Sequence, residues 1–277
     1  MDTTRASAPV GESGQAHVSL KQAERRWQDA QGGALQQHAY GRPGTRVVLD
    51  GQFRRIAAAL KLTPGMRLLD LGCGVGHLLR WLAAKADGMY HGLDLSLTSL
   101  ASAKEAEPTL RLAAGDAEML PYKDGSFDRI SCNGSAHHLL DECAAFREMY
   151  RVLAPGGILV LHEPTSTPLT SALRRLLLRT NRYESPADLA HKEEFTPARV
   201  RVFLAEAGFT DISPSFHDFL AYPLSGNYLA SPFARSQSFM RLAWRVETAL
   251  AQCSFLKPLL DLFAWRLLVV SVKPKGR

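Results

Sequence analysis

The stretch Leu68-Leu69-Asp70-Leu71-Gly72-Cys73-Gly74-Val75-Gly76-His77 decides the fold class of this chain. An apolar run ends in an acid and enters a glycine-rich turn, and residues 78–82 continue with helical character. Glycine accepts positive φ and leaves room for a ligand against the main chain. The first turn of a helix offers free N–H groups and a positive dipole end. The pattern predicts a cofactor-binding strand, turn and helix; a tight connection without a ligand is the alternative.

The glycine spacing separates two kinds of cofactor. A dinucleotide fingerprint, G-x-G-x-x-G, would place its third glycine at position 77. Here position 77 is histidine and the third glycine is Gly76. This spacing disfavours an NAD-dependent oxidoreductase. With Asp70 ahead of it, the turn resembles motif I of the class I S-adenosylmethionine (SAM)-dependent methyltransferases.

Later segments follow the same family's order. The run 88–93 ends at Asp94, about 20 residues beyond the glycine turn, where an acid at the end of a second strand reaches ribose hydroxyls. Ser96 stands where it can cap the next helix. In the family, a segment like Gly115-Asp116-Ala117 contacts adenine through the Asp side chain and the next backbone N–H.

Three further segments extend the resemblance over residues 63–213. Residues 126–133 resemble the family's fourth strand, residues 151–161 its R-V-L-x-P-G-G helix, turn and strand, and residues 195–209 the helix before its sixth strand. The chain is most similar to the ubiquinone/menaquinone methyltransferase-like group, which acts on small molecules and lipids. The resemblance implies a Rossmann-like α/β sheet of seven strands, mostly parallel with an antiparallel strand seven.

The resemblance also implies SAM as cofactor, with S-adenosylhomocysteine as product. The expected acceptor is a small, largely apolar or lipid-like molecule, with O-, N- and C-methylation left open. A non-catalytic SAM-binding module is the alternative. The resemblance to the methyltransferase family implies ten cofactor-binding residues: Asp70, Gly72, Cys73, Gly74, Gly76, Asp94, Leu95, Asp116, Ala117 and Asn133.

An oxygen or nitrogen acceptor needs a base if it carries a proton. Ligands of doubly wound sheets bind at the carboxyl ends of the parallel strands. That position selects His137 and His138 after the fourth strand, and His162 and Glu163 after the fifth. We rank His162 and Glu163 first, because in the resembling family the paired histidines after strand four often face the cofactor or pack.

Three additions surround this core. We expect a mobile tail over 1–17, a helical cap over 18–62 and the methyltransferase domain over 63–277. In the cap, Ser19 is expected to begin a helix that runs to Ala30, residues 41–44 to form a turn, and residues 45–60 a second helix.

Strand six is expected over 212–221 and strand seven over 265–273, with a helical insert at about 222–263 that closes over the acceptor. Packing into a shared core is the alternative for the insert, since its apolar residues suit both roles. The candidate substrate-lining residues are Trp27, Tyr40, Tyr222, Phe233 and Phe239.

Composition indicates the class of protein, whether a metal is expected, and the cellular compartment. A chain of 277 residues with 46% hydrophobic and 22% charged residues is ordinary for a globular protein, and its net charge of +6 is mild. The four cysteines show no C-x-x-C pair, so we expect no metal and a reducing cytoplasm. No secretory signal or apolar run of membrane-spanning length is present.

Two sequence segments indicate whether the chain binds nucleic acid or a membrane. Residues 133–136 lack the Pro-Pro-aromatic motif that nucleic-acid base methyltransferases carry after strand four, so no nucleic acid is expected. Residues 169–183 have leucines on one helical face and arginines on another, which suits peripheral contact with an anionic membrane. A solvated arginine face above packed leucines is the alternative. The oligomeric state is left open.

Overall fold

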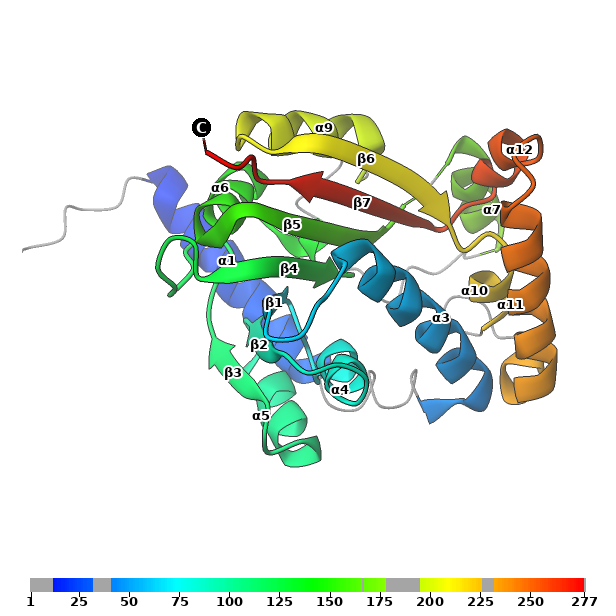
Figure 1. Ribbon diagram of the computed structural model, residues 1–277, viewed down its shortest axis with the longest axis horizontal. Helices are drawn as coiled ribbons and strands as arrows, with labels where there is room; N and C mark the ends of the chain where they lie inside the picture. The colour runs from blue at the N-terminus through cyan, green and yellow to red at the C-terminus, as the bar shows by residue number, and fades with distance from the viewer. Residues whose placement is uncertain (1–11, 32–40, 166, 178–194, 226–231, 277) are drawn as a thin grey trace, which may run out of the picture.

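The computed structural model describes residues 12–31, 41–165, 167–177, 195–225 and 232–276 (Figure 1). They contain a seven-stranded sheet of order β3-β2-β1-β4-β5-β7-β6. Strand β7 is antiparallel to β5 and β6, and the other pairs are parallel. The strands are β1 (Arg67–Leu71), β2 (Met89–Asp94), β3 (Arg111–Ala114), β4 (Phe127–Asn133), β5 (Leu153–Pro164), β6 (Thr210–His217) and β7 (Arg266–Val272). The fold class expected from the glycine turn is therefore confirmed.

Helices cover both faces of this sheet. Side chains alternate along a strand, so Leu68 enters one apolar cluster while Leu69 and Leu71 enter another. The cluster around Leu68 includes residues of α3 (Pro43–Leu60), α4 (His77–Ala83) and α5 (Leu97–Ala106). The other includes residues of α6 (Glu142–Val152) and α9 (Pro197–Glu206). The two-sided burial explains the continuous apolar runs at residues 158–161 of β5 and 267–270 of β7.

The turns that place the ligand-binding loops follow local rules. The Ser96 side chain accepts a hydrogen bond from the Ser99 N–H and so caps α5, as expected. The Asp141 carboxylate caps α6 in the same way. Pro155 and the two glycines after it lie inside β5, where the pairing with β4 shifts register.

Three expected boundaries are wrong. Helix α1 (Glu12–Gln31) begins at Glu12, so residues 12–17 are helical and Ser19 does not cap the helix. Pro43 and Gly44 open α3 instead of forming a turn, because proline suits the first helical turn. Strand β6 ends at His217, since Asp218 takes a left-handed φ of 64° and the helix α10 (Ala221–Leu224) begins soon afterwards.

The segment between β6 and β7 is helical where it is described. It contains α10, the 3₁₀ turn η2 (Pro232–Arg235), α11 (Gln237–Ala251) and α12 (Lys257–Asp261). These elements lie beyond the carboxyl end of β5, beside α3 and α7 (Pro168–Leu177) (Figure 1). A third apolar cluster joins α3 to the insert through Val48, Met240 and Trp265. No helix in the described ranges is long and apolar enough to cross a membrane.

Candidate active site

The glycine turn after β1 depends on backbone freedom. Gly72, Gly74 and Gly76 have φ values of 65°, 52° and 74°. The N–H groups of Gly72 and Cys73 donate to the Leu93 carbonyl at 2.8 and 3.1 Å, which ties the turn to the end of β2. A Cβ on Gly72 would lie 2.3 Å from that of Ser135, so this residue has no room for a side chain. The turn meets the geometric needs of a cofactor cradle.

Asp94 joins two loops at the edge of this cradle. One carboxylate oxygen accepts the Gly74 N–H at 2.7 Å, and the other accepts the Ser96 N–H at 2.8 Å. Burial raises the pKa of Asp94, although these two hydrogen bonds lower it. Each oxygen keeps a second lone pair, so a ribose hydroxyl can still donate to it.

Asp70 lies deeper than the other candidate cofactor residues. It is buried at the end of β1 and accepts the Ser131 hydroxyl at 2.7 Å. Burial raises its pKa to about 7. The Cys73 thiol is also buried and points to the Gly74 carbonyl, whereas Leu95 is half-buried in the loop after Asp94.

The loop after β3 carries the expected adenine contact. Asp116 accepts the Glu118 N–H at 2.9 Å with one oxygen and pairs with Lys21 Nζ at 2.5 Å with the other. Lys21 also forms an ion pair with Glu118. Ala117 packs against the apolar cluster on the β1 face that contains Leu69. Lone pairs of Asp116 therefore remain for a ligand, next to a lysine supplied by α1.

Helix α1 crosses the loops that follow three strands. Asp29 accepts the Ser96 hydroxyl at 2.7 Å in the loop after β2, and Lys21 reaches Asp116 after β3. After β4, Glu24 lies 3.4 Å from His138 Nδ1. These three residues were not among the sequence-based candidates, because charged side chains on a helix are expected to face solvent.

His137, in the turn after β4, forms a hydrogen-bonded pair with Glu163. Glu163 and His162 lie inside β5 and not after it as expected, because β5 continues to Pro164. Glu163 is fully buried, and its Oε1 accepts the N–H groups of Gly134, Ser135 and Ala136 at 3.0–3.1 Å. Its Oε2 lies 2.8 Å from His137 Nδ1. A carboxylate only accepts hydrogen bonds, so His137 Nδ1 carries the hydrogen and Nε2 is the acceptor nitrogen. Glu163 thus orients His137 and has no access to a ligand.

His162 is enclosed as well. The ring is fully buried, with Nδ1 2.9 Å from Asn133 Oδ1 and Nε2 4.0 Å from Asp218 Oδ2. Burial, followed by the positive charge of Arg266, holds the pKa of His162 well below its ordinary value. The ring is therefore neutral and out of reach of solvent.

The four base candidates differ in how exposed their side chains are. His137 and His138 keep 23% and 20% of their side chains exposed, whereas His162 and Glu163 keep 0%. The rings of His137 and His138 lie 4.0 Å apart, and the Trp27 ring of α1 lies 6.3 Å from His138.

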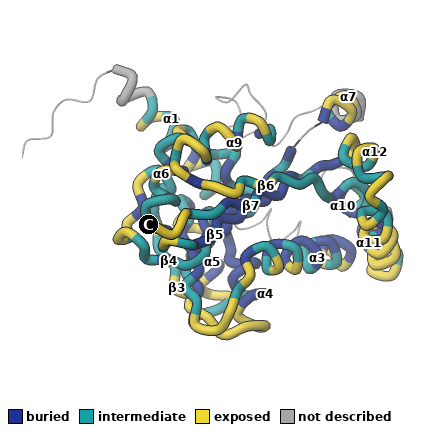
Figure 2. The backbone as a smooth tube through the Cα atoms, turned by 45° about the horizontal axis from the view of Figure 1, so that its top comes forward, coloured by how far each residue is buried: buried dark blue, intermediate teal, exposed yellow. Residues whose placement is uncertain are grey.

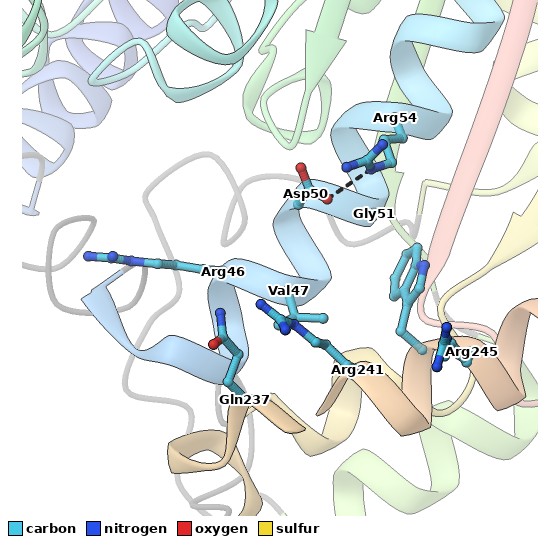
Figure 3. A pocket seen from close by; sticks show the side chains of 9 residues that line it. Arg46, Val47, Asp50, Gly51, Arg54, Gln237, Arg241 and Arg245 are labelled. Carbon is cyan, nitrogen blue, oxygen red and sulfur yellow. Dashed lines mark hydrogen bonds and ion pairs between the residues drawn. The ribbon is translucent and has the colours of Figure 1, made fainter. Parts of the chain in front are cut away.

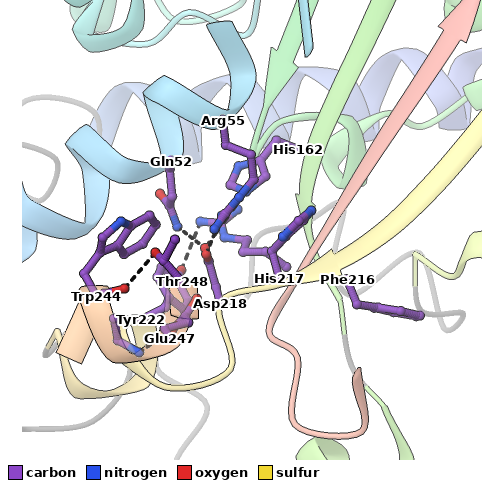
Figure 4. Close-up of polar contacts among 12 residues, drawn as sticks. Gln52, Arg55, His162, Phe216, His217, Asp218, Tyr222, Trp244, Glu247 and Thr248 are labelled. Atoms are coloured by element: carbon purple, nitrogen blue, oxygen red, sulfur yellow. Dashed lines mark hydrogen bonds and ion pairs between the residues drawn. The ribbon is translucent and has the colours of Figure 1, made fainter. Parts of the chain in front are cut away.

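A buried charged cluster stands behind His162 (Figure 4). Asp218 is fully buried and accepts Arg55 Nη1 at 2.6 Å and also the Gln52 amide. Glu247 of α11 is 2% exposed and accepts the N–H groups of Leu220 and Ala221 at 3.0 and 2.7 Å. The cluster connects α3 and α11 to the end of β6. No motif in the sequence predicts these contacts.

Glu247 makes the stability of this cluster depend on pH. Burial, followed by the charge of Asp218, raises its pKa to about 7 from an ordinary 4.5. The folded state then binds more protons than the unfolded state between these values, so stability falls as pH rises from 4.5 to 7. We expect Glu247→Gln, which keeps an acceptor oxygen, to raise Tm at pH 8 and leave it unchanged at pH 4. Calorimetric scans check this; an equal shift at both values would contradict it.

The described substrate candidates come from several different helices. Tyr222 is buried, and its hydroxyl lies 3.0 Å from an Arg266 guanidinium nitrogen. Phe233 and Phe239 stack with ring centroids 4.4 Å apart, but Phe233 is 44% exposed. Trp27 lies near the histidine pair, and Tyr40 falls outside the described residues. Trp27 therefore lies at the histidine pair, whereas the other described candidates lie in the insert.

Comparison with known proteins now identifies the family. The sequence profile described as "Methyltransferase domain" matches residues 69–161. The demethylmenaquinone methyltransferase of Renibacterium salmoninarum is 33% identical over 168 residues, which cover 58% of this chain and 68% of that protein. The chain belongs to the class I SAM-dependent methyltransferases. The resemblance drawn from the glycine turn is confirmed, and SAM is the cofactor of this family.

Other relatives agree. The demethylmenaquinone methyltransferase of Streptomyces griseus subsp. griseus is 35% identical over 129 residues, or 46% of this chain and 56% of the relative. The match thus spans a little over half the length of that methyltransferase. A solved phosphoethanolamine N-methyltransferase of Haemonchus contortus superposes with a TM-score of 0.59 at 20% identity, covering 91% of this chain and 60% of the other. That likeness shows the shared methyltransferase fold.

Proposed function

We propose that this chain transfers the methyl group of SAM to a small, largely apolar acceptor with an ionisable hydroxyl, of the quinol type. The observation that carries the proposal is His137, which is partly exposed and fixed in one tautomer by Glu163. It lies after β4, at the edge where doubly wound sheets bind ligands. The two similar proteins named demethylmenaquinone methyltransferases support a quinol-type acceptor.

In this proposal, different residues bind the cofactor and remove the proton from the acceptor. Bound SAM supplies a methyl group already activated on a sulfonium. Asp94 would hold the ribose hydroxyls and Asp116 the adenine amino group, while the glycine turn admits the ligand to the backbone. His137 Nε2 would accept the acceptor's hydroxyl proton, and Glu163 would stabilise the imidazolium that results. Positioning by the surrounding side chains supplies the rest of the rate.

The acceptor side is proposed from the helices around this point. Trp27 of α1 and the insert residues Tyr222 and Phe239 would supply apolar lining, in keeping with the few polar groups of most ligand sites. Residues 63–277 would form the catalytic domain with 18–62 as its cap.

The free cysteines support a reducing compartment, which we propose is the cytoplasm.

Release of S-adenosylhomocysteine tests the proposal. The purified chain is incubated with SAM and a short-chain demethylmenaquinol under reducing conditions, and both products are followed by mass spectrometry. We expect S-adenosylhomocysteine and methylated quinol to form in equal amounts, and only when acceptor is present. SAM binding without transfer to this acceptor or to a panel of phenols would favour the non-catalytic SAM-binding module.

Loss of the Asp94 carboxylate should weaken the cofactor site. We expect Asp94→Ala to reduce SAM affinity by about 1.5–3 kcal/mol, the usual worth of hydrogen bonds to a charged group. Asp87→Ala, an exposed acid at the opposite end of β2, is the matched control. Titration calorimetry measures both. A folded Asp94→Ala variant that binds SAM as tightly as Asp87→Ala would remove Asp94 from the site.

A further inference from the structure

Helix α11 has an outer side that no described element covers. Its inner residues Met240, Ala243 and Glu247 are buried against α3 and α10. On the outer side, Leu242 and Val246 are 59% and 41% exposed, one helical turn apart. Figure 2 shows this side of α11 as exposed at one end of the molecule. Two large apolar side chains are thus open to solvent in one stripe.

Further large apolar side chains are exposed beyond the end of α11. Phe255 is 80% exposed and Leu259 is 55% exposed, and Leu262 and Phe263 follow at 46% and 42%. We call Leu242, Val246, Phe255, Leu259, Leu262 and Phe263 the outer apolar surface. Soluble proteins rarely expose several large apolar side chains together unless the surface binds something.

A basic groove lies directly beside this stripe, between α3 and α11 (Figure 3). Its volume is about 590 Å³, and its lining residues include Arg46, Arg54, Arg241 and Arg245. Arg241 and Arg245 immediately precede Leu242 and Val246 in α11. Asp50 is the one carboxylate in the lining, and it is already bonded to Arg54 Nε and Trp81 Nε1 at 2.8 Å. The groove is therefore strongly positive.

We propose that α11 and the α12 region dock on an anionic lipid bilayer. Lipid phosphates would occupy the arginine groove, and the outer apolar surface would enter the boundary between headgroups and acyl chains. Guanidinium groups suit phosphate, and an interfacial helix needs both an apolar stripe and neighbouring cations. A second copy of this chain fits less well, because symmetric contact would bring the same arginines face to face.

The proposed surface lies at the end of the molecule where the acceptor would enter. The insert stands beyond the carboxyl end of β5, and the Thr167 hydroxyl that precedes α7 donates to the Leu262 carbonyl. Leu169, at the start of α7, is 42% exposed at the same edge. Docking here would let a lipid-like acceptor pass from the bilayer to the site. This benefit rests on the proposed function, whereas the docking surface itself does not.

Vesicle sedimentation tests the proposal without any methyl transfer. The full chain is mixed with vesicles of phosphatidylcholine alone, or of equal parts phosphatidylcholine and phosphatidylglycerol. We expect binding to the anionic vesicles and little to the neutral ones. Each basic residue near an anionic surface strengthens binding about five-fold, so Arg241→Glu/Arg245→Glu should weaken it at least about 25-fold. Leu242→Asp/Phe255→Asp should weaken it about ten-fold or more.

A matched variant controls for net charge. Arg147→Glu/Arg201→Glu changes the charge equally at exposed positions of α6 and α9, far from α11 (Figure 1), and should bind like the wild type. Calorimetric scans and SAM affinity verify that every variant is folded. Failure of the wild type to bind anionic vesicles, or equal loss in the control variant, overturns the proposal. So does a wild-type dimer in sedimentation velocity that Leu242→Asp/Phe255→Asp dissociates, since the surface would then join two copies.

Discussion

His137→Ala is expected to lower turnover about 10²–10⁴-fold, the usual range for a lost general base, with SAM affinity unchanged. His137 Nδ1 is engaged by Glu163 at 2.8 Å, so Nε2 is the nitrogen left to accept a proton. The glycine turn and Asp94 do not depend on this ring. The loss should therefore fall on turnover and spare the cofactor.

Rescue by an external base separates this role from simple packing. Added imidazole should restore part of the turnover lost in His137→Ala, whereas a loss caused by packing alone should not respond to it. His91→Ala is the control, because His91 is a half-buried histidine of β2 that packs edge-on to Phe127. Near-normal turnover in His137→Ala would transfer the role to His138 or leave catalysis to positioning alone.

Glu163→Ala should be the most damaging substitution for stability. Three backbone N–H groups after β4 would lose their shared acceptor inside the protein. Each buried N–H left without an acceptor costs about 1–3 kcal/mol, which together corresponds to a Tm lower by roughly 10 °C. Thermal unfolding measured by circular dichroism checks the shift. An unchanged Tm would mean that the loop does not need the carboxylate.

Glu163→Gln separates the structural role of this residue from its effect on His137. The glutamine carbonyl can still accept the three N–H groups, so most of the stability should return. Its amide nitrogen would then face His137 Nδ1 and favour the tautomer with the hydrogen on Nε2. We expect a folded variant that binds SAM but turns over about 10²–10⁴-fold more slowly. Wild-type turnover in this variant would show that the tautomer of His137 is irrelevant.

The fold was largely predictable because its signals are local. The glycine turn, Ser96 and the apolar runs of the strands each fix their own segment, and their order gives the sheet. The boundaries that failed depend on distant partners. Gly44 opens α3 where a Cβ would lie 2.5 Å from the Ala234 carbonyl of the insert. The residues next to Gly44 in the sequence do not indicate that the insert packs against this position.

The sequence indicated which residues lie near the site but not how exposed each one is. Strand ends selected His137, His138, His162 and Glu163 as candidates, and the structure brings these four near one another. Their relative exposure was hidden, because Glu163 is buried by loops whose path the residues around it do not encode. The same holds for Arg55 and Asp218, which lie 163 positions apart and meet as an ion pair inside the protein.

The attachment of α1 has a kinetic consequence. The helix holds the loops after β2, β3 and β4 through Asp29, Lys21 and Glu24, and Glu24 is the buried residue among these contacts. Ion pairs near the surface contribute only about 0–1 kcal/mol each, and dissolved salt weakens them further. We expect a helix fastened in this way to detach more readily than the sheet unfolds. Exchange of S-adenosylhomocysteine for SAM should therefore run faster as ionic strength rises, with the frequency of α1 detachment as its upper limit.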